Sequence, residues 1–173
     1  MVANPSLNVG NYSLTANSTP AAAPNVWKTL QGLMGAFPQY ARTSVHLSTE
    51  SYGGHYGPVF AEYFETQNAA GAGQKISLQS LSVGNGWYDP RIQYPAYYNY
   101  TVNPGNSYNY SPYNTSEAEM VYNMFWGSGN CVDQLNDCNE RGIDEVCSAA
   151  DNFCYAVESV FDDVTGRDEY DIR

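Results

Sequence analysis

The stretch TESYGGHYGP, at residues 49–58, constrains the fold of this chain more than any other part of the sequence. It follows a run with strand character at residues 44–48 and precedes apolar residues with helical spacing. Gly53 and Gly54 come soon after Ser51, where small residues let a strand and a helix approach each other closely. We therefore predict a tight strand-to-helix turn that exposes the Ser51 hydroxyl, which makes Ser51 a candidate nucleophile.

The short pattern leaves a second interpretation open. Thr49 stands where such turns usually carry glycine. The three positions Ser-x-Gly alone do not distinguish a nucleophile from an ordinary serine in a glycine-rich loop.

The neighbouring segments favour a parallel α/β sheet. A helix is predicted from Pro24 to Pro38, and the strand at residues 44–48 is followed by a helix that ends near Gly71. A second strand is predicted at residues 76–83, where it runs into a Gly-Asn-Gly turn. This order of helix, strand, helix and strand is typical of a parallel sheet.

We expect three regions along the chain. Residues 1–23 are polar and are predicted to be poorly ordered. Residues 24–90 are predicted to form a partial α/β core, and residues 91–173 a tyrosine-rich segment and a set of helices. For residues 87–113, rich in tyrosine, proline and asparagine, a semi-ordered excursion is favoured over a carbohydrate- or peptide-binding platform.

A capping box of Ser116 and Glu119 predicts the start of a helix before the four cysteines of the chain. The cysteines are separated by 7, 9 and 7 positions, and residues seven apart lie on nearly the same face of a helix. Two short helices folded back as a hairpin favour nested disulfides, with a metal site or free thiols as the alternatives. The nested pairs are Cys131–Cys154 and Cys138–Cys147.

The net charge of −11 argues against nucleic acid or an anionic membrane as partners. No apolar run is long enough to span a bilayer, and the N-terminus has no signal-peptide pattern. The predicted disulfides and five Asn-x-Ser/Thr sequons nevertheless favour the secretory pathway and possible N-glycans. The sequon asparagines are Asn11, Asn17, Asn99, Asn109 and Asn114.

The longer string ESYGGHYGP closely resembles the active-site signature of the serine carboxypeptidase family, in particular its fungal members. The stretches VWKTLQGLMGAFPQY, LSVGNGWYDP and GRDEYDIR, together with the cysteine spacing, resemble further parts of that family over most of residues 20–173. The resemblance implies a partial α/β-hydrolase fold, made of a strand-turn-helix with a neighbouring parallel strand, and a disulfide-linked helical cap insertion.

The resemblance also implies a reaction, the release of C-terminal residues from peptides at acidic pH without a cofactor. Ser51 would be the nucleophile, and the backbone N–H of Tyr52 would supply one oxyanion-hole donor. Glu50 and Gly53 would contribute to substrate binding, with Glu50 hydrogen-bonded to the free α-carboxylate of the substrate. Two carboxyl groups in contact need a shared proton, which gives a physical reason for an acidic optimum.

Other parts of the family pattern are absent from these 173 residues. The chain has two histidines, His46 and His55, and neither follows a candidate Asp in the order Ser, Asp, His. We therefore expect a central fragment of a carboxypeptidase, inactive alone because serine is a poor nucleophile without a base. A non-catalytic secreted glycoprotein that binds peptides or protein partners is the main alternative, and acyl transfer to an alcohol is a third.

Overall fold

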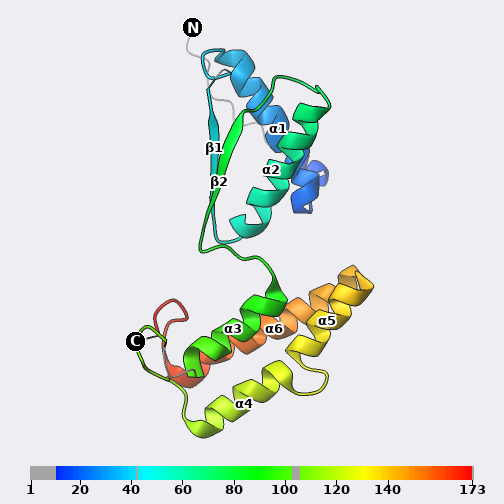
Figure 1. The fold of residues 1–173 in the computed structure, drawn as a ribbon. Helices are drawn as coiled ribbons and strands as arrows, with labels where there is room; N and C mark the ends of the chain where they lie inside the picture. The colour runs from blue at the N-terminus through cyan, green and yellow to red at the C-terminus, as the bar shows by residue number, and fades with distance from the viewer. Residues whose placement is uncertain (1–10, 42, 103–105, 173) are drawn as a thin grey trace. The chain divides into compact units, whose positions relative to one another are not determined.

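The computed structural model describes residues 11–41, 43–102 and 106–172. The chain divides into two compact units, Met1–Tyr88 and Asp89–Arg173 (Figure 1). The first contains the 3-10 helix η1 (Tyr12–Leu14), α1 (Thr19–Ala36), β1 (Val45–Glu50), α2 (Gly53–Ala69) and β2 (Leu78–Gly84). The second contains α3 (Pro90–Val102), α4 (Thr115–Trp126), α5 (Cys131–Arg141) and α6 (Asp144–Thr165).

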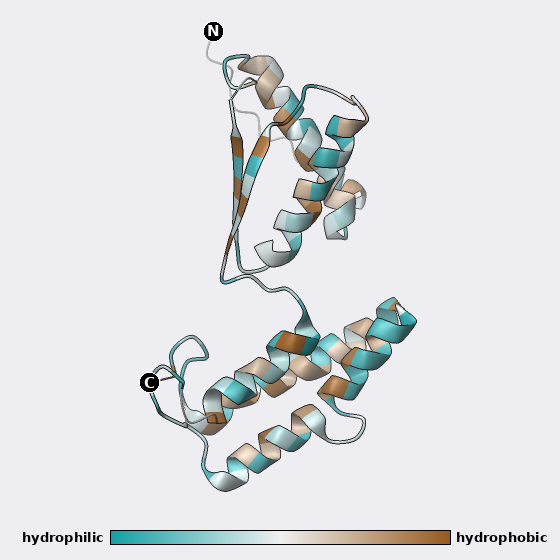
Figure 2. Ribbon diagram, viewed as in Figure 1, coloured by the Kyte–Doolittle hydropathy of each residue, from teal (hydrophilic) through white to brown (hydrophobic). Residues whose placement is uncertain are grey.

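In the first unit, β1 and β2 form a parallel pair, as the alternation of helices and strands predicts. Helix α2 packs against both strands and α1 packs against α2 (Figure 1). The core of this unit is formed by Trp27, Met34, Phe64 and Ile76. Hydrophobic and hydrophilic residues alternate over the first part of β1 (Figure 2), and partly buried positions alternate with exposed ones along the whole strand.

Helix α1 begins five residues earlier than the sequence analysis predicts. The Ser18 side chain accepts a hydrogen bond of 3.3 Å from the N–H of Ala21, which caps the helix at Thr19. Pro24 therefore lies inside α1 instead of starting it. The prediction that residues 1–23 are poorly ordered is wrong for the part from Thr19 onward, while residues 1–10 lie outside the described residues.

The second strand is also shorter than predicted, because Ile76 is held outside the sheet. The Asn68 side chain donates to the Ile76 carbonyl at 2.8 Å and accepts from its N–H at 2.9 Å. These two bonds satisfy the backbone of Ile76 without a strand partner, and its side chain is buried in the core. The strand begins only at Leu78.

In the second unit, α5 and α6 form an antiparallel hairpin that turns at Gly142, a residue with φ of 60°. The structure has the disulfides Cys131–Cys154 and Cys138–Cys147, so the cysteines are nested along the hairpin. The core of this unit includes Val121 and Phe125 from α4 and Val157 from α6.

The prediction of a semi-ordered tyrosine-rich segment is wrong for residues 90–102, which form α3. The Asp89 side chain accepts a hydrogen bond of 3.0 Å from the N–H of Arg91, and Pro90 occupies the first helical position. Tyr94 is fully buried and its hydroxyl donates to Asp151 at 3.2 Å. A tyrosine that packs on α6 in this way orders the segment, a long-range effect that local composition does not reveal.

The capping box of α4 is formed by Asn114 and Glu117 and not by the predicted Ser116 and Glu119. Asn114 accepts from the N–H of Glu117 at 3.0 Å, and the Glu117 carboxylate accepts from the N–H of Asn114 at 2.9 Å. Ser116 instead donates its hydroxyl to Asn114 at 2.7 Å. Within the described residues, no helix is both long enough and apolar enough to cross a membrane.

Candidate active site

Ser51 lies directly after β1 in the left-handed region of the Ramachandran plot, with φ of 58°. Its backbone is fixed from three directions. Its N–H donates to the Gly84 carbonyl at 3.1 Å, and its own carbonyl accepts from Trp87 at 2.8 Å and from Gly54 at 3.0 Å. A positive φ at a residue with a Cβ is strained, and these three bonds hold it in place.

The Ser51 side chain is exposed, and its hydroxyl has no hydrogen-bond partner within residues 11–41, 43–102 and 106–172. The chain thus turns sharply between β1 and α2 and leaves a hydroxyl free to react.

The turn is possible because glycines occupy the start of α2. A Cβ added at Gly54 would overlap the backbone of Trp87, at 2.7 Å from its carbonyl carbon. A Cβ at Gly57 would lie 2.8 Å from the side chain of Leu81. Both glycines are buried. A residue with a side chain at either position would keep α2 from approaching β2 and the loop after it this closely.

Thr49, the departure from the usual glycine, packs against Gly53, the second glycine of the pattern. A Cβ at Gly53 would overlap the side chain of Thr49, and the Thr49 hydroxyl donates to the Gly53 carbonyl at 3.0 Å. The threonine therefore fills the space that the missing side chain at Gly53 leaves. The glycines after Ser51 are visible in the sequence, but the contact of Gly53 with Thr49 is not.

Tyr52 follows Ser51 and precedes the first residue of α2. No described residue accepts a hydrogen bond from its backbone N–H, which belongs to the unsatisfied donors at a helix start. The ring of Tyr52 packs against His55, Tyr56 and Trp87, with centroid distances of 4.7, 4.9 and 6.4 Å. The role of Trp87, as backbone donor and ring neighbour, is absent from the sequence analysis.

Glu50 is the last residue of β1, is exposed and pairs with Gly84 in the strand register. The two histidines lie elsewhere. Nδ1 of His46 is 2.8 Å from the hydroxyl of Ser80, and His55 packs its ring on Tyr52. Within the described residues, Ser51 makes no hydrogen bond to a histidine that would act as its base. No cluster of possible metal ligands occurs in those residues either.

A strand that ends in a left-handed serine, followed by a helix with buried glycines, is the backbone arrangement typical of a strand-turn-helix elbow in the α/β-hydrolase class. A family model for serine carboxypeptidases matches residues 6–173. The chain belongs to the serine carboxypeptidase family, which confirms the resemblance in the sequence.

Curated fungal proteins are similar over nearly the whole chain. Carboxypeptidase S1 of Penicillium janthinellum is 38% identical over 162 residues, which is 90% of this chain and 37% of that protein. Carboxypeptidase Y of Candida albicans is 32% identical, over 96% of this chain and 30% of that protein. The chain thus spans about a third of the length of these relatives.

A solved structure has a similar fold. Kex1(delta)p, a prohormone-processing carboxypeptidase from Saccharomyces cerevisiae, aligns with a TM-score of 0.59 and 21% sequence identity. The alignment covers 81% of this chain and 29% of the yeast chain. This likeness supports the partial α/β-hydrolase fold.

Proposed function

We propose that Ser51 is the nucleophile of a serine-type carboxypeptidase reaction that proceeds through an acyl-enzyme. The observation that carries the proposal is the left-handed backbone of Ser51 between β1 and α2, with its hydroxyl exposed. The free N–H of Tyr52 supports its role as an oxyanion-hole donor, because a helix start favours developing negative charge.

Glu50 and Gly53 are proposed to help bind the substrate, a peptide or protein C-terminus. Glu50 precedes the nucleophile and is exposed, so its carboxyl group can meet the substrate carboxylate beside the scissile bond. The pair can share a proton only when the solution is acidic enough to supply one. Binding therefore weakens as the pH rises above the range in which the pair holds that proton.

The 173-residue chain alone is proposed to have no appreciable peptidase activity. His46 is engaged with Ser80 and His55 with Tyr52, so neither serves as base for Ser51. Loss of the base from such a triad costs on the order of a million-fold in turnover.

A second function, peptide or partner binding without catalysis in the secretory pathway, is favoured by this same lack of a base. All five sequon asparagines are exposed, which supports N-glycosylation of such a protein. The two disulfides support an oxidising compartment.

A chimera tests the nucleophile independently of the isolated chain. The matched 162 residues of Carboxypeptidase S1 are replaced by this sequence, and the release of C-terminal residues from a blocked peptide is measured. We expect release and labelling by a fluorophosphonate, both abolished by Ser51→Ala. A chimera with intact disulfides that has neither activity nor label supports the binding function instead. Ser51-dependent release by the 173-residue chain alone would contradict the proposed inactivity.

A further inference from the structure

The net negative charge of the chain comes from its second unit alone. Residues 89–173 contain 15 acidic and 4 basic residues, whereas residues 1–88 contain 3 of each. The first unit is therefore formally neutral, and the second carries the whole net charge of −11. Such a field attracts cationic ligands and raises their local concentration.

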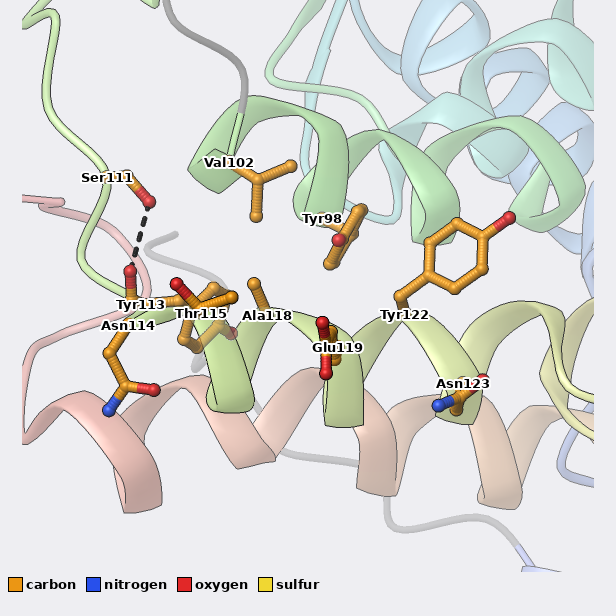
Figure 3. Close-up of a pocket in the computed structure, with 10 residues that line it drawn as sticks. All are labelled: Tyr98, Val102, Ser111, Tyr113, Asn114, Thr115, Ala118, Glu119, Tyr122 and Asn123. Carbon is orange, nitrogen blue, oxygen red and sulfur yellow. Dashed lines mark hydrogen bonds between the residues drawn. The ribbon is translucent and has the colours of Figure 1, made fainter.

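An open cleft of about 540 Å³ lies in the second unit between α3 and α4 (Figure 3). Tyr98 and Val102 project into it from α3, and Glu119 and Tyr122 belong to the facing helix α4. None of the described residues that line the cleft is a lysine or an arginine. The cleft thus has carboxylate and aromatic groups but no cation of its own.

The aromatic wall of the cleft is supported from behind. Tyr122 stacks on Trp126 with centroids 4.8 Å apart. The ring of Tyr98 is steeply inclined to both, with centroid distances of 5.8 Å to Tyr122 and 5.3 Å to Trp126. Packing of this kind holds the rings in position before a ligand arrives, which lowers the entropy cost of binding.

Glu119 supplies the charge at this wall. Within the described residues its carboxylate has neither an ion pair nor a hydrogen bond. Its charge acts on the neighbouring Tyr98, whose pKa is raised by burial and, to a lesser extent, by Tyr122 and Glu119. An unpaired carboxylate beside tyrosine rings is a suitable counter-ion for an organic cation.

The same unit already contains a contact of this chemistry. The guanidinium of Arg167 lies 5.0 Å from the ring centroid of Tyr110 and donates to its hydroxyl at 3.0 Å. Tyrosine rings of this unit thus accept a guanidinium group. At the cleft the rings have no such partner among the residues that line it.

We propose that the cleft between α3 and α4 binds the ammonium or guanidinium group of a lysine or arginine side chain in a peptide. Glu119 is the counter-ion, and the rings of Tyr98 and Tyr122 supply the aromatic faces. The proposed contact requires neither Ser51 nor the C-terminal carboxylate of a peptide.

Nuclear magnetic resonance titration of the 173-residue chain with two blocked tripeptides tests this proposal. The probes are N-acetyl-Gly-Lys-Gly-amide and its arginine analogue, each paired with a neutral match that contains norleucine or citrulline. Because both ends are blocked, the result is independent of the proposed capture of a free C-terminus. We expect the cationic peptides to bind about tenfold more tightly than their matches and to shift the signals of residues in the cleft.

Two glutamate variants distinguish the site from the general field, and two variants of Tyr122 test the aromatic ring. Glu119→Gln should weaken the binding of the cationic peptides about fivefold or more. Glu140→Gln removes one exposed charge from α5, outside the cleft, and should change the affinity for these peptides less than about twofold. Tyr122→Phe keeps the ring and should retain binding, and Tyr122→Leu should lose most of it. Equal effects of the two glutamate variants, equal binding of the neutral peptides, or shifts confined to other parts of the chain would overturn the proposal.

Discussion

The N–H of Trp87 donates a hydrogen bond of 2.8 Å to the carbonyl of Ser51. The bond joins the turn after β1 to the loop after β2. The N–H of Ser51 donates a second hydrogen bond, of 3.1 Å, to the carbonyl of Gly84 at the end of β2. The geometry of the candidate nucleophile therefore depends on two separate segments of the first unit. A change in the loop after β2 would alter the turn at Ser51 without touching its side chain.

Gly54→Ala tests this close approach. The new Cβ would overlap the backbone of Trp87, so we expect a loss of about 3 kcal/mol in the stability of the first unit. Gly32→Ala is the matched control inside α1, where an added Cβ meets nothing within 4 Å. It should stabilise the helix by about 0.5–1 kcal/mol. Hydrogen exchange of the amides in the first unit measures both effects, and a neutral Gly54→Ala would contradict the described turn.

Asn114→Ala should weaken the start of α4, because it removes the side chain that caps Glu117. We expect a loss of about 1 kcal/mol, seen as faster hydrogen exchange in the first turn of the helix. Asn114→Ser abolishes the sequon but retains a capping oxygen, so it should have little effect on stability. If both variants destabilise α4 equally, the cap does not have the role described.

The two disulfides should contribute unequally to the stability of the second unit. Cys131–Cys154 joins residues 23 positions apart and Cys138–Cys147 joins residues 9 apart. Replacing the first pair by serine should cost about 3.4 kcal/mol and the second about 2.6 kcal/mol, because the longer loop gains more entropy on unfolding. The midpoint of thermal unfolding, followed by circular dichroism, should fall further when the first pair is replaced than when the second is. The reverse result would contradict this prediction.

Glu158 makes the stability of the second unit depend on pH. Burial raises the pKa of Glu158 from 4.5 to about 7, helped by the nearby charges of Glu169, Asp151 and Asp162. A carboxyl group with a raised pKa binds its proton more tightly in the folded state than in the unfolded state. The stabilisation of the folded state that comes from this tighter proton binding is therefore fully present below pH 4.5, and it is lost as the pH rises to about 7.

Across this pH window we expect the free energy of unfolding to fall more for the wild type than for Glu158→Gln. After allowance for solvent screening, the difference should be on the order of 1 kcal/mol. Denaturant unfolding at several pH values from 4 to 8 gives the comparison. Glu140→Gln, an exposed change on α5, should keep the wild-type pH dependence. Parallel curves for wild type and Glu158→Gln would show that Glu158 has no such role.

Local patterns predicted much of the first unit. The spacing of apolar residues and the glycines after Ser51 were enough for β1, α2 and the sharp turn between them. The limits of β2 were not predictable, because they depend on Asn68, which satisfies the backbone of Ile76 from another element. The helical state of α3 likewise depends on the contact of Tyr94 with Asp151, 57 positions away.

The candidate site was predicted only where its residues are close in sequence. Glu50, Ser51 and Tyr52 are consecutive and were identified together. Trp87 was missed, because its hydrogen bond to Ser51 forms only when the two strands pair. The contact between Thr49 and Gly53 was missed for a similar reason, since it depends on side-chain packing and not on spacing.

The reactivity of a thiol at position 51 tests the elbow most directly, because it needs no triad base. The rate of alkylation by iodoacetamide is measured against pH for Ser51→Cys and for Ser48→Cys, an exposed position on β1, with both native disulfides verified by mass. At the start of α2 the helix lowers the thiol pKa, so Ser51→Cys should react faster at pH 7 and titrate below about 8.5. A thiol at position 51 that reacts more slowly than the control, or titrates at or above about 8.5, would contradict an outward-facing nucleophile at this turn.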